Sequence, residues 1–130
     1  MSRKVLIVDK SLYNRMILRD ILISHGYSVV EASTGDEAIE TYKKTRPDLV
    51  TVDIMMPGID GVKAVREIRM IDPKATVLMC GSRGQQRKAM EGMSLGAEGI
   101  LLKPFVERHV IRSIKQAMGH APDASRMNGF

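Results

Sequence analysis

Five short aliphatic runs, spaced almost evenly along the chain, constrain the fold more than any other feature. They are VLIV (5–8), SVVE (28–31), DLVTVD (48–53), ATVLMC (75–80) and EGILL (98–102). Such continuous apolar runs are typical of strands buried on both faces of a sheet. They end near residues 8, 31, 53, 80 and 102, so successive ends lie 23, 22, 27 and 22 residues apart. Each gap is long enough for a crossover helix and two short loops, which predicts a parallel sheet.

Helical patterns fill the segments between and after these runs. The first predicted helix spans 12–25 and is followed by Gly26, a residue favoured just beyond a helix end. Ser33 or Thr34 is expected to cap the second helix, and Pro47 to stop it. The apolar positions of the second to fifth helices are Ala38, Ile39 and Tyr42; Val62, Val65 and Ile68; Met90 and Met93; and Val106, Val110, Ile114 and Ala117. The fourth helix is expected to end at Gly96, and its two methionines to fill irregular core space.

Five strands alternating with five helices predict an α/β fold with a doubly wound, five-stranded parallel sheet between two layers of helices. The chain of 130 residues suits one domain. We expect this domain to span 1–118. Residues 119–130 are mostly glycine, proline and polar residues without periodicity, and we interpret them as a flexible C-terminal tail.

Composition narrows the functional classes. No apolar run approaches the roughly 20 residues needed to span a bilayer, and the N-terminus lacks the features of a signal peptide, so we expect a cytoplasmic protein without a membrane partner. The single cysteine, Cys80, is expected to be a buried strand residue. The net charge of +5 permits an acidic partner. Nucleic acid is not indicated, because no basic stripe is interleaved with aromatic residues.

Polar or charged residues follow four of the five predicted strands, at the edge where sites form in such sheets. They are Asp9 and Lys10, Asp53, Gly81 and Ser82, and Lys103. The stretch DIMMPGIDG (53–61) places a carboxylate at a strand end before a turn-forming proline and two glycines. LLKPF (101–105) places a lysine before a proline that permits a cis turn. Asp53 facing Lys103 would be a nucleophile beside a cation.

Together, VLIVD, DIMMPGIDG and LLKPF resemble the receiver domain of bacterial response regulators, most closely the single-domain chemotaxis regulators of the CheY-like type, over residues 3–118. The resemblance implies a flavodoxin-like fold and a role in two-component signal transduction rather than turnover catalysis. Asp53 would accept a phosphoryl group from a histidine kinase or phosphotransfer protein. Asp9, Asp53 and the backbone carbonyl of Met55 would hold Mg²⁺, and Lys103 would bind the phosphoryl oxygens.

Three positions depart from the family pattern. Lys10 stands where the family usually has a second acidic residue. Gly81 stands where a threonine or serine is usual, and Ser82 where a small residue is usual, so Ser82 is a candidate for supplying the hydroxyl. Ile100 replaces the aromatic residue that switches between buried and exposed positions on the fifth strand.

Lys10 leaves two interpretations of the site open. Asp9 and Asp53 carry two negative charges and Lys10 and Lys103 two positive ones, so the site is near neutral without metal. If Lys10 points inward, its ammonium pairs with Asp9 or Asp53 and weakens or replaces Mg²⁺. If it turns to solvent on its flexible stem, Asp53 is still phosphorylated, and this is the interpretation we favour. The alternative is a pseudo-receiver that binds its partner independently of phosphorylation.

The target of such receivers usually binds the face formed by the fourth helix, fifth strand and fifth helix. Arg108, His109, Arg112 and Lys115 lie on the predicted fifth helix and favour an acidic partner. Three other classes fit less well. A phosphatase of the aspartate-nucleophile type needs a second carboxylate where Met55 stands, a flavodoxin-like cofactor carrier needs a loop richer in hydroxyls than KSLYN, and a nucleic-acid module needs more than five aromatic residues.

Overall fold

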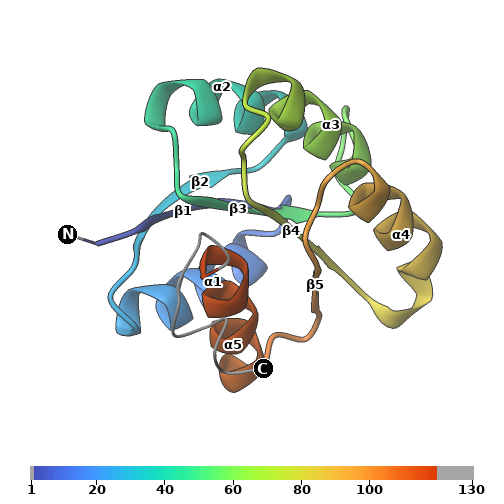
Figure 1. The fold of residues 1–130 in the computed structure, drawn as a ribbon. Coiled ribbons are helices and arrows are strands. Elements are labelled where there is room, and N and C mark those ends of the chain that lie inside the picture. Colours follow the sequence, from blue (N-terminus) through green and yellow to red (C-terminus); the bar gives the residue numbers. More distant parts are fainter. Residues whose placement is uncertain (1, 120–130) are drawn as a thin grey trace.

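Five parallel strands form one sheet in the order β2-β1-β3-β4-β5 (Figure 1). The computed structural model describes residues 2–119. The strands are β1 (Lys4–Val8), β2 (Ser28–Ala32), β3 (Leu49–Asp53), β4 (Val77–Gly81) and β5 (Ile100–Leu102). The predicted tail falls almost wholly on residues 120–130, which lie outside the described residues.

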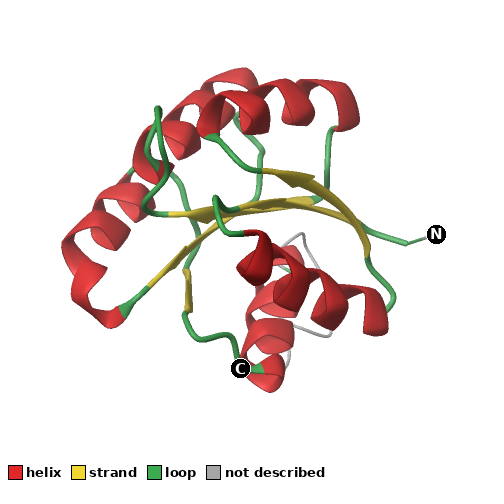
Figure 2. Ribbon diagram, turned by 180° about the vertical axis from the view of Figure 1, so that it is seen from behind, coloured by secondary structure: helices red, strands yellow, loops and turns green. Residues whose placement is uncertain are grey.

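Five α-helices connect and flank the strands, and they lie in two layers. They are α1 (Leu12–Ser24), α2 (Gly35–Thr45), α3 (Gly61–Ile71), α4 (Gln86–Ser94) and α5 (Glu107–Met118), with a short 3₁₀ turn, η1 (Arg83–Gln85), before α4. Helices α1 and α5 cover one face of the sheet, and α2, α3 and α4 cover the other (Figures 1 and 2). The predicted doubly wound, flavodoxin-like fold is confirmed.

The alternation of side chains along each strand builds one core on each face of the sheet. In β1, Leu6 and Val8 join the cluster that packs against α2, α3 and α4, whereas Val5 and Ile7 join the cluster against α1 and α5. Every residue of β3 and β4 is buried, as expected for central strands of a sheet covered on both faces. Cys80 belongs to the second cluster and is buried, as predicted.

The element boundaries follow local chemistry, with small differences from the expected ones. Thr34 is the residue that caps α2, because its side chain accepts a hydrogen bond from the N–H of Glu37. Helix α1 ends at Ser24 instead of residue 25. The fifth strand begins at Ile100 instead of residue 98. The Lys103–Pro104 peptide bond is cis, as the LLKPF segment indicated.

Helix α4 differs most from its prediction. It ends at Ser94 rather than Gly96, and Met90 and Met93 are 70% and 46% exposed rather than part of the core. The buried face of α4 consists of the small residues Ala89 and Gly92. A Cβ atom added at Gly92 would lie 2.9 Å from the sulfur of Met79, so a methionine of the sheet already fills the space below this helix. The methionines of α4 therefore point outward.

No helix within residues 2–119 combines the length and the apolar character needed to cross a membrane.

Candidate functional site

Asp9 and Asp53 lie side by side at the carboxyl edge of the sheet. Val8 of β1 pairs with Val52 of β3, so the residues that follow them leave adjacent strands at the same level. Both aspartates are almost fully buried, with exposed fractions of 3% and 4%. Burial, and after it the carboxylate of Asp9, raise the pKa of Asp53 above the usual value for an aspartate, while Lys103 and Lys10 oppose this rise. Two like charges in one buried site call for a cation.

Lys103 supplies that cation from the end of β5. Its Nζ lies 2.8 Å from Oδ2 of Asp9 and 3.1 Å from Oδ1 of Asp53, so one ammonium bridges both carboxylates. Burial alone would lower the pKa of Lys103, but the hydrogen bond to Asp9 and the attraction of both carboxylates outweigh burial and raise it. The lysine is therefore charged throughout the neutral pH range. The juxtaposition of Asp53 and Lys103 agrees with the placement of these residues at strand ends.

The position of Lys10 in the structure matches neither of the two interpretations of the sequence completely. Its Nζ donates a hydrogen bond of 3.2 Å to the backbone carbonyl oxygen of Met55, and the residue is exposed. Within the described part of the chain, the ion pairs of Asp9 and Asp53 are with Lys103. In the structure Lys10 thus lies on the carbonyl of Met55, whereas Lys103 forms the ion pairs with the two aspartates.

Gly81 ends β4 beside this site and Ser82 follows it, and both lie next to Gln85, a residue that was not predicted to belong to the site. The N–H of Ser82 donates a 2.8 Å hydrogen bond to Oε1 of Gln85. A Cβ atom added at Gly81 would lie only 2.7 Å from this same oxygen and 2.6 Å from Cδ1 of Ile54. The Gln85 carboxamide thus occupies the space next to the strand end. The serine followed three residues later by glutamine is a pattern typical of a helix start, and it indicates this contact.

The loop between β3 and α3 is held against the site by its own hydrogen bonds. The N–H of Gly61 donates to the carbonyl of Ile54 over 2.9 Å. Asp60 caps α3 by accepting from the N–H of Lys63, and its other carboxylate oxygen lies 3.6 Å from Nζ of Lys88 in α4. These contacts position the backbone that follows Asp53, including the carbonyl of Met55.

Ile100 lies apart from the charged cluster. It is the first residue of β5 and is partly buried against the core beneath α2, α3 and α4. The structure thus brings together Asp9, Asp53, Lys103 and, through Met55, Lys10, whereas Ile100 lies three residues before Lys103 along the chain.

Three oxygen donors at this edge match the chemistry of a hard divalent cation: the carboxylates of Asp9 and Asp53 and the carbonyl of Met55. Within residues 2–119, no three side chains of the His, Cys, Asp or Glu type form a group suited to a metal, so a third protein ligand beside the two aspartates would be a backbone oxygen such as that of Met55. The residues fit Mg²⁺ in donor type. The hydrogen bond from Lys10 competes for the carbonyl of Met55.

Comparisons with known proteins agree with this arrangement. The family model of the response regulator receiver domain matches residues 5–115. The chain is 41% identical over 119 residues to the chemotaxis protein CheY of Bacillus subtilis (strain 168), covering 91% of this chain and 99% of that protein. It is 42% identical over 117 residues to the chemotaxis protein CheY of Thermotoga maritima, covering 89% and 98%. A solved structure of the chemotaxis protein CheY4 of Vibrio cholerae matches with a TM-score of 0.85 at 31% identity, covering 90% of this chain and 99% of that one.

Proposed function

The chain belongs to the response regulator receiver domain family, and on this premise we propose that it accepts a phosphoryl group on Asp53 and passes the signal to a partner protein. Response regulators are two-component signalling proteins, not enzymes in the usual sense, and they interact with histidine kinases and downstream targets. We assign the receiver function to residues 1–118, the cytoplasm as its compartment, and a histidine kinase or phosphotransfer protein as its phosphodonor.

The observation that carries the proposal is the bridge from Lys103 to Asp9 and Asp53. An Asp53 carboxylate oxygen attacks the phosphorus atom of the donor, a phosphorus–oxygen bond forms, and the bond to the donor's leaving group breaks. Phosphoryl transfer depends chiefly on positioning and on neutralising the oxygens of the transferred group. Lys103 remains anchored to Asp9 while its ammonium stabilises the oxygens that arrive on Asp53.

Receiver domains generally use Mg²⁺ at the phosphorylation site. In this chain Asp9, Asp53 and the carbonyl of Met55 would hold the ion. When bound, it supplies positive charge to the phosphoryl oxygens. Lys10 donates to one of these three oxygens and places its positive charge beside the ion, so we propose that Lys10 weakens Mg²⁺ binding until it moves away. Its exposed position allows this movement without disturbing the core.

We propose that the conformational response of this chain to phosphorylation also differs from the response usual in receiver domains. A hydroxyl side chain at position 81 would collide with Ile54 and Gln85, so the missing hydroxyl cannot be restored there without local movement. We propose that Ser82, the residue after Gly81, supplies its hydroxyl and its backbone N–H to the phosphoryl group. The N–H is held by Gln85 before phosphorylation, so its transfer to a phosphoryl oxygen would loosen the start of η1. We propose that Ile100 is the residue of β5 whose side chain changes position on phosphorylation. Its aliphatic side chain is smaller than the aromatic side chain that is usual there.

The proposal is tested by incubating the protein with a small-molecule phosphodonor and Mg²⁺ and following the intact mass. We expect a gain of one phosphoryl group that is absent from Asp53→Asn. Asp60→Asn is the matched control, because Asp60 is a carboxylate of the same loop that keeps its capping contact as an amide. A phosphoryl group found equally on Asp53→Asn would disprove the assignment of the phosphoacceptor.

One observation favours a second candidate function. The 3.2 Å hydrogen bond from Lys10 to Met55 places an ammonium at one of the three oxygens proposed for Mg²⁺. In this alternative, Lys10 replaces the ion and the domain binds its partner independently of phosphorylation. It requires that the wild-type protein gains no phosphoryl group at any Mg²⁺ concentration.

A further inference from the structure

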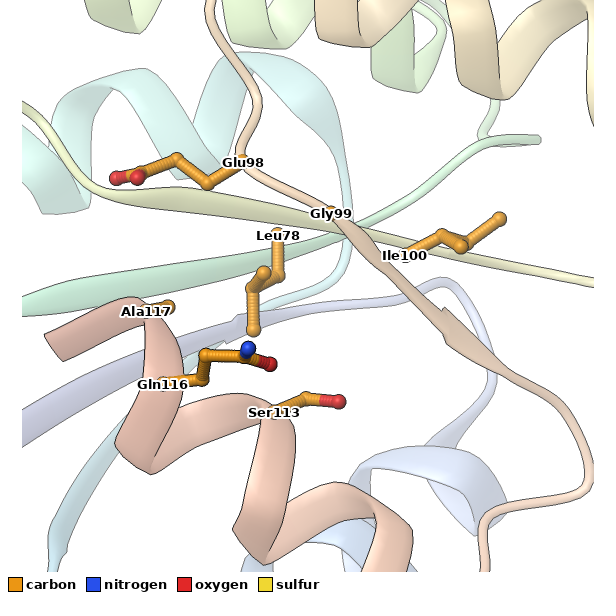
Figure 3. Close-up of a pocket in the computed structure, with 7 residues that line it drawn as sticks. All are labelled: Leu78, Glu98, Gly99, Ile100, Ser113, Gln116 and Ala117. Carbon is orange, nitrogen blue, oxygen red and sulfur yellow. The ribbon is translucent and has the colours of Figure 1, made fainter. Parts of the chain in front are cut away.

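The two flanks of the charged site are built differently. On the β5 flank, two cavities of about 340 and 690 Å³ lie between β5 and α5, and Ile100 and Ser113 line both of them. Figure 3 shows the smaller cavity, and Lys103 lines the larger one. On the opposite flank, charged side chains of α1 and β2 form hydrogen bonds with each other and with the backbone of Asp9. Asp9 is therefore fixed by its surroundings, whereas Lys103 borders a cavity.

Arg15 of α1 makes the central contacts of this second flank. Its Nη1 donates a hydrogen bond of 2.6 Å to the backbone carbonyl oxygen of Asp9, and its Nε donates one of 3.0 Å to Oε1 of Glu31 in β2. The side chain of Arg15 is only 15% exposed. Because a guanidinium group holds its donors in a rigid planar fork, the bond to Glu31 sets the direction in which Nη1 points.

Glu31 is held in place from two directions. Its backbone lies in β2, where it pairs with Ile7 of β1, two residues before Asp9. Its other carboxylate oxygen, Oε2, accepts a hydrogen bond of 3.3 Å from Nη1 of Arg19, which lies about one helical turn after Arg15. Within residues 2–119, Arg19 reaches the carboxylate of Glu31 but not the carbonyl of Asp9. The two arginines thus share one anchor, and Arg15 connects it to the site.

The polar groups of Asp9 are all bound in the structure. Its N–H donates to the carbonyl of Ala32 over 3.1 Å, and its Oδ1 accepts from the N–H of Ser11 over 2.9 Å. Lys103 binds Oδ2, and Arg15 binds the carbonyl oxygen. Asp9 is only 3% exposed, so a carbonyl oxygen that lost Arg15 would have little access to water. The peptide after Asp9 would then turn toward another donor and displace the Asp9 carboxylate from its present contacts.

We propose that Arg15, oriented by Glu31, is a positioning residue that directs the Asp9 carboxylate toward the site assigned to Mg²⁺. The inference rests on the proposed function, since it concerns one of the three oxygens assigned to the ion. Arg15 acts through Asp9 and is not itself a ligand. Removing the outer hydrogen-bond partners of metal ligands typically weakens metal binding about 10- to 100-fold.

The charge of Arg15 makes this proposal sharply testable, because charge and positioning have opposite effects. Arg15→Gln removes a positive charge near the site of a cation, so electrostatics alone would tighten Mg²⁺ binding. Displacement of Asp9 would weaken it, and we expect a loss of about tenfold. Arg15→Lys keeps the charge but replaces the planar fork by a single nitrogen, so it should also weaken Mg²⁺ binding severalfold.

The experiment is a titration of ¹⁵N-labelled protein with Mg²⁺ alone, in which the amide resonances of Asp53 and Met55 report binding and the whole spectrum reports folding. Arg19→Gln is the matched control. It removes the same charge from the same helix and the same Glu31 carboxylate, but it keeps the contact between Arg15 and Asp9, so it should bind Mg²⁺ within about twofold of wild type. All variants are also made in Lys10→Ala, so that movement of Lys10 cannot mask the effect.

Three outcomes would overturn the proposal. They are equal or tighter Mg²⁺ binding by a folded Arg15→Gln or Arg15→Lys variant, an equal loss in Arg19→Gln, and no binding of Mg²⁺ by either wild type or Lys10→Ala. The intact mass of wild type after incubation with a small-molecule phosphodonor shows separately whether Asp53 accepts a phosphoryl group. A failure of Arg15 as a positioning residue and a failure of the proposed function are therefore distinguishable.

Discussion

At the scale of single residues, the site is a balance among four charges that lie at different depths. Asp9, Asp53 and Lys103 are bound to one another at the end of the sheet, and they leave one negative charge unmatched. Lys10 lies at the periphery on a carbonyl oxygen. The arrangement prepares Asp53 to receive a group whose oxygens Lys103 can bind, and it makes the ionised form of Asp53 costly in the resting protein.

Removing the charge of Asp53 should therefore stabilise the fold. Because the pKa of Asp53 is raised in the folded protein, the folded state holds this proton more readily than the unfolded chain does. Ionised Asp53 thus lowers the free energy of unfolding, and the loss grows as pH rises through the raised pKa. We expect Asp53→Asn to increase the free energy of unfolding at pH 7 by about 1 kcal/mol, measured by urea denaturation, with a gain that shrinks toward acid pH.

Lys103→Met provides the opposing control for this stability prediction. It leaves two buried carboxylates without their cation and should lower the free energy of unfolding by roughly 3–5 kcal/mol, the usual cost of breaking a buried ion pair on one side. Adding Asp53→Asn to this variant should restore part of the loss. A loss of stability in Asp53→Asn at neutral pH would show that the lysine bridge outweighs the repulsion between the aspartates.

At the scale of elements, the site depends on how closely α3 approaches the end of β3. A Cβ atom added at Gly61, the first residue of α3, would lie 2.8 Å from the Cα of Ile54 and would also collide with the backbone carbonyl of Asp53. This contact brings the start of α3 directly onto the backbone of the residue proposed to be phosphorylated. Only the absence of a side chain permits it.

Gly61→Ala should therefore damage both stability and the site. We expect the free energy of unfolding to fall by about 3 kcal/mol or more, because the obstructing atoms are backbone that cannot turn aside. Gly84→Ala in η1 is the matched control, since nothing lies within 4 Å of its added Cβ, and it should change stability by less than about 1 kcal/mol. Thermal unfolding of the two variants makes the comparison, and equal effects would contradict the close packing of α3 on β3.

At the scale of the whole molecule, the fold was predictable from sequence because the alternation of aliphatic runs and helical segments repeats along the whole domain. The spacing of the five aliphatic runs and the chirality of crossovers leave few arrangements, and the strand exits then place Asp9, Asp53 and Lys103 together. The directions of individual side chains depend instead on their neighbours in space, which the spacing of residues along the chain does not encode. Lys10 reaches the carbonyl of Met55 while Lys103 bridges both aspartates, and Met90 and Met93 are exposed while Met79 fills the space beneath α4.

Other features escaped prediction because they arise only when elements meet. Gln85 contacts Ser82 through a local pattern that the sequence does contain. In contrast, the two cavities that Ile100 of β5 and Ser113 of α5 line form only where this strand and this helix meet. No periodic pattern of residues along the chain predicts such cavities.

Phosphorylation of Asp53 and the role of Lys10 are tested together by measuring the rate of Asp53 phosphorylation as a function of Mg²⁺ concentration, in wild type and in Lys10→Asp. We expect both proteins to gain one phosphoryl group from a small-molecule donor. Under our proposal, wild type needs about tenfold more Mg²⁺ than Lys10→Asp for half-maximal rate, because Lys10 competes for the carbonyl of Met55 and adds a positive charge beside the ion. Phosphorylation of Lys10→Asp alone, with none in wild type at any Mg²⁺ concentration, would contradict it and establish Lys10 as the replacement for the metal.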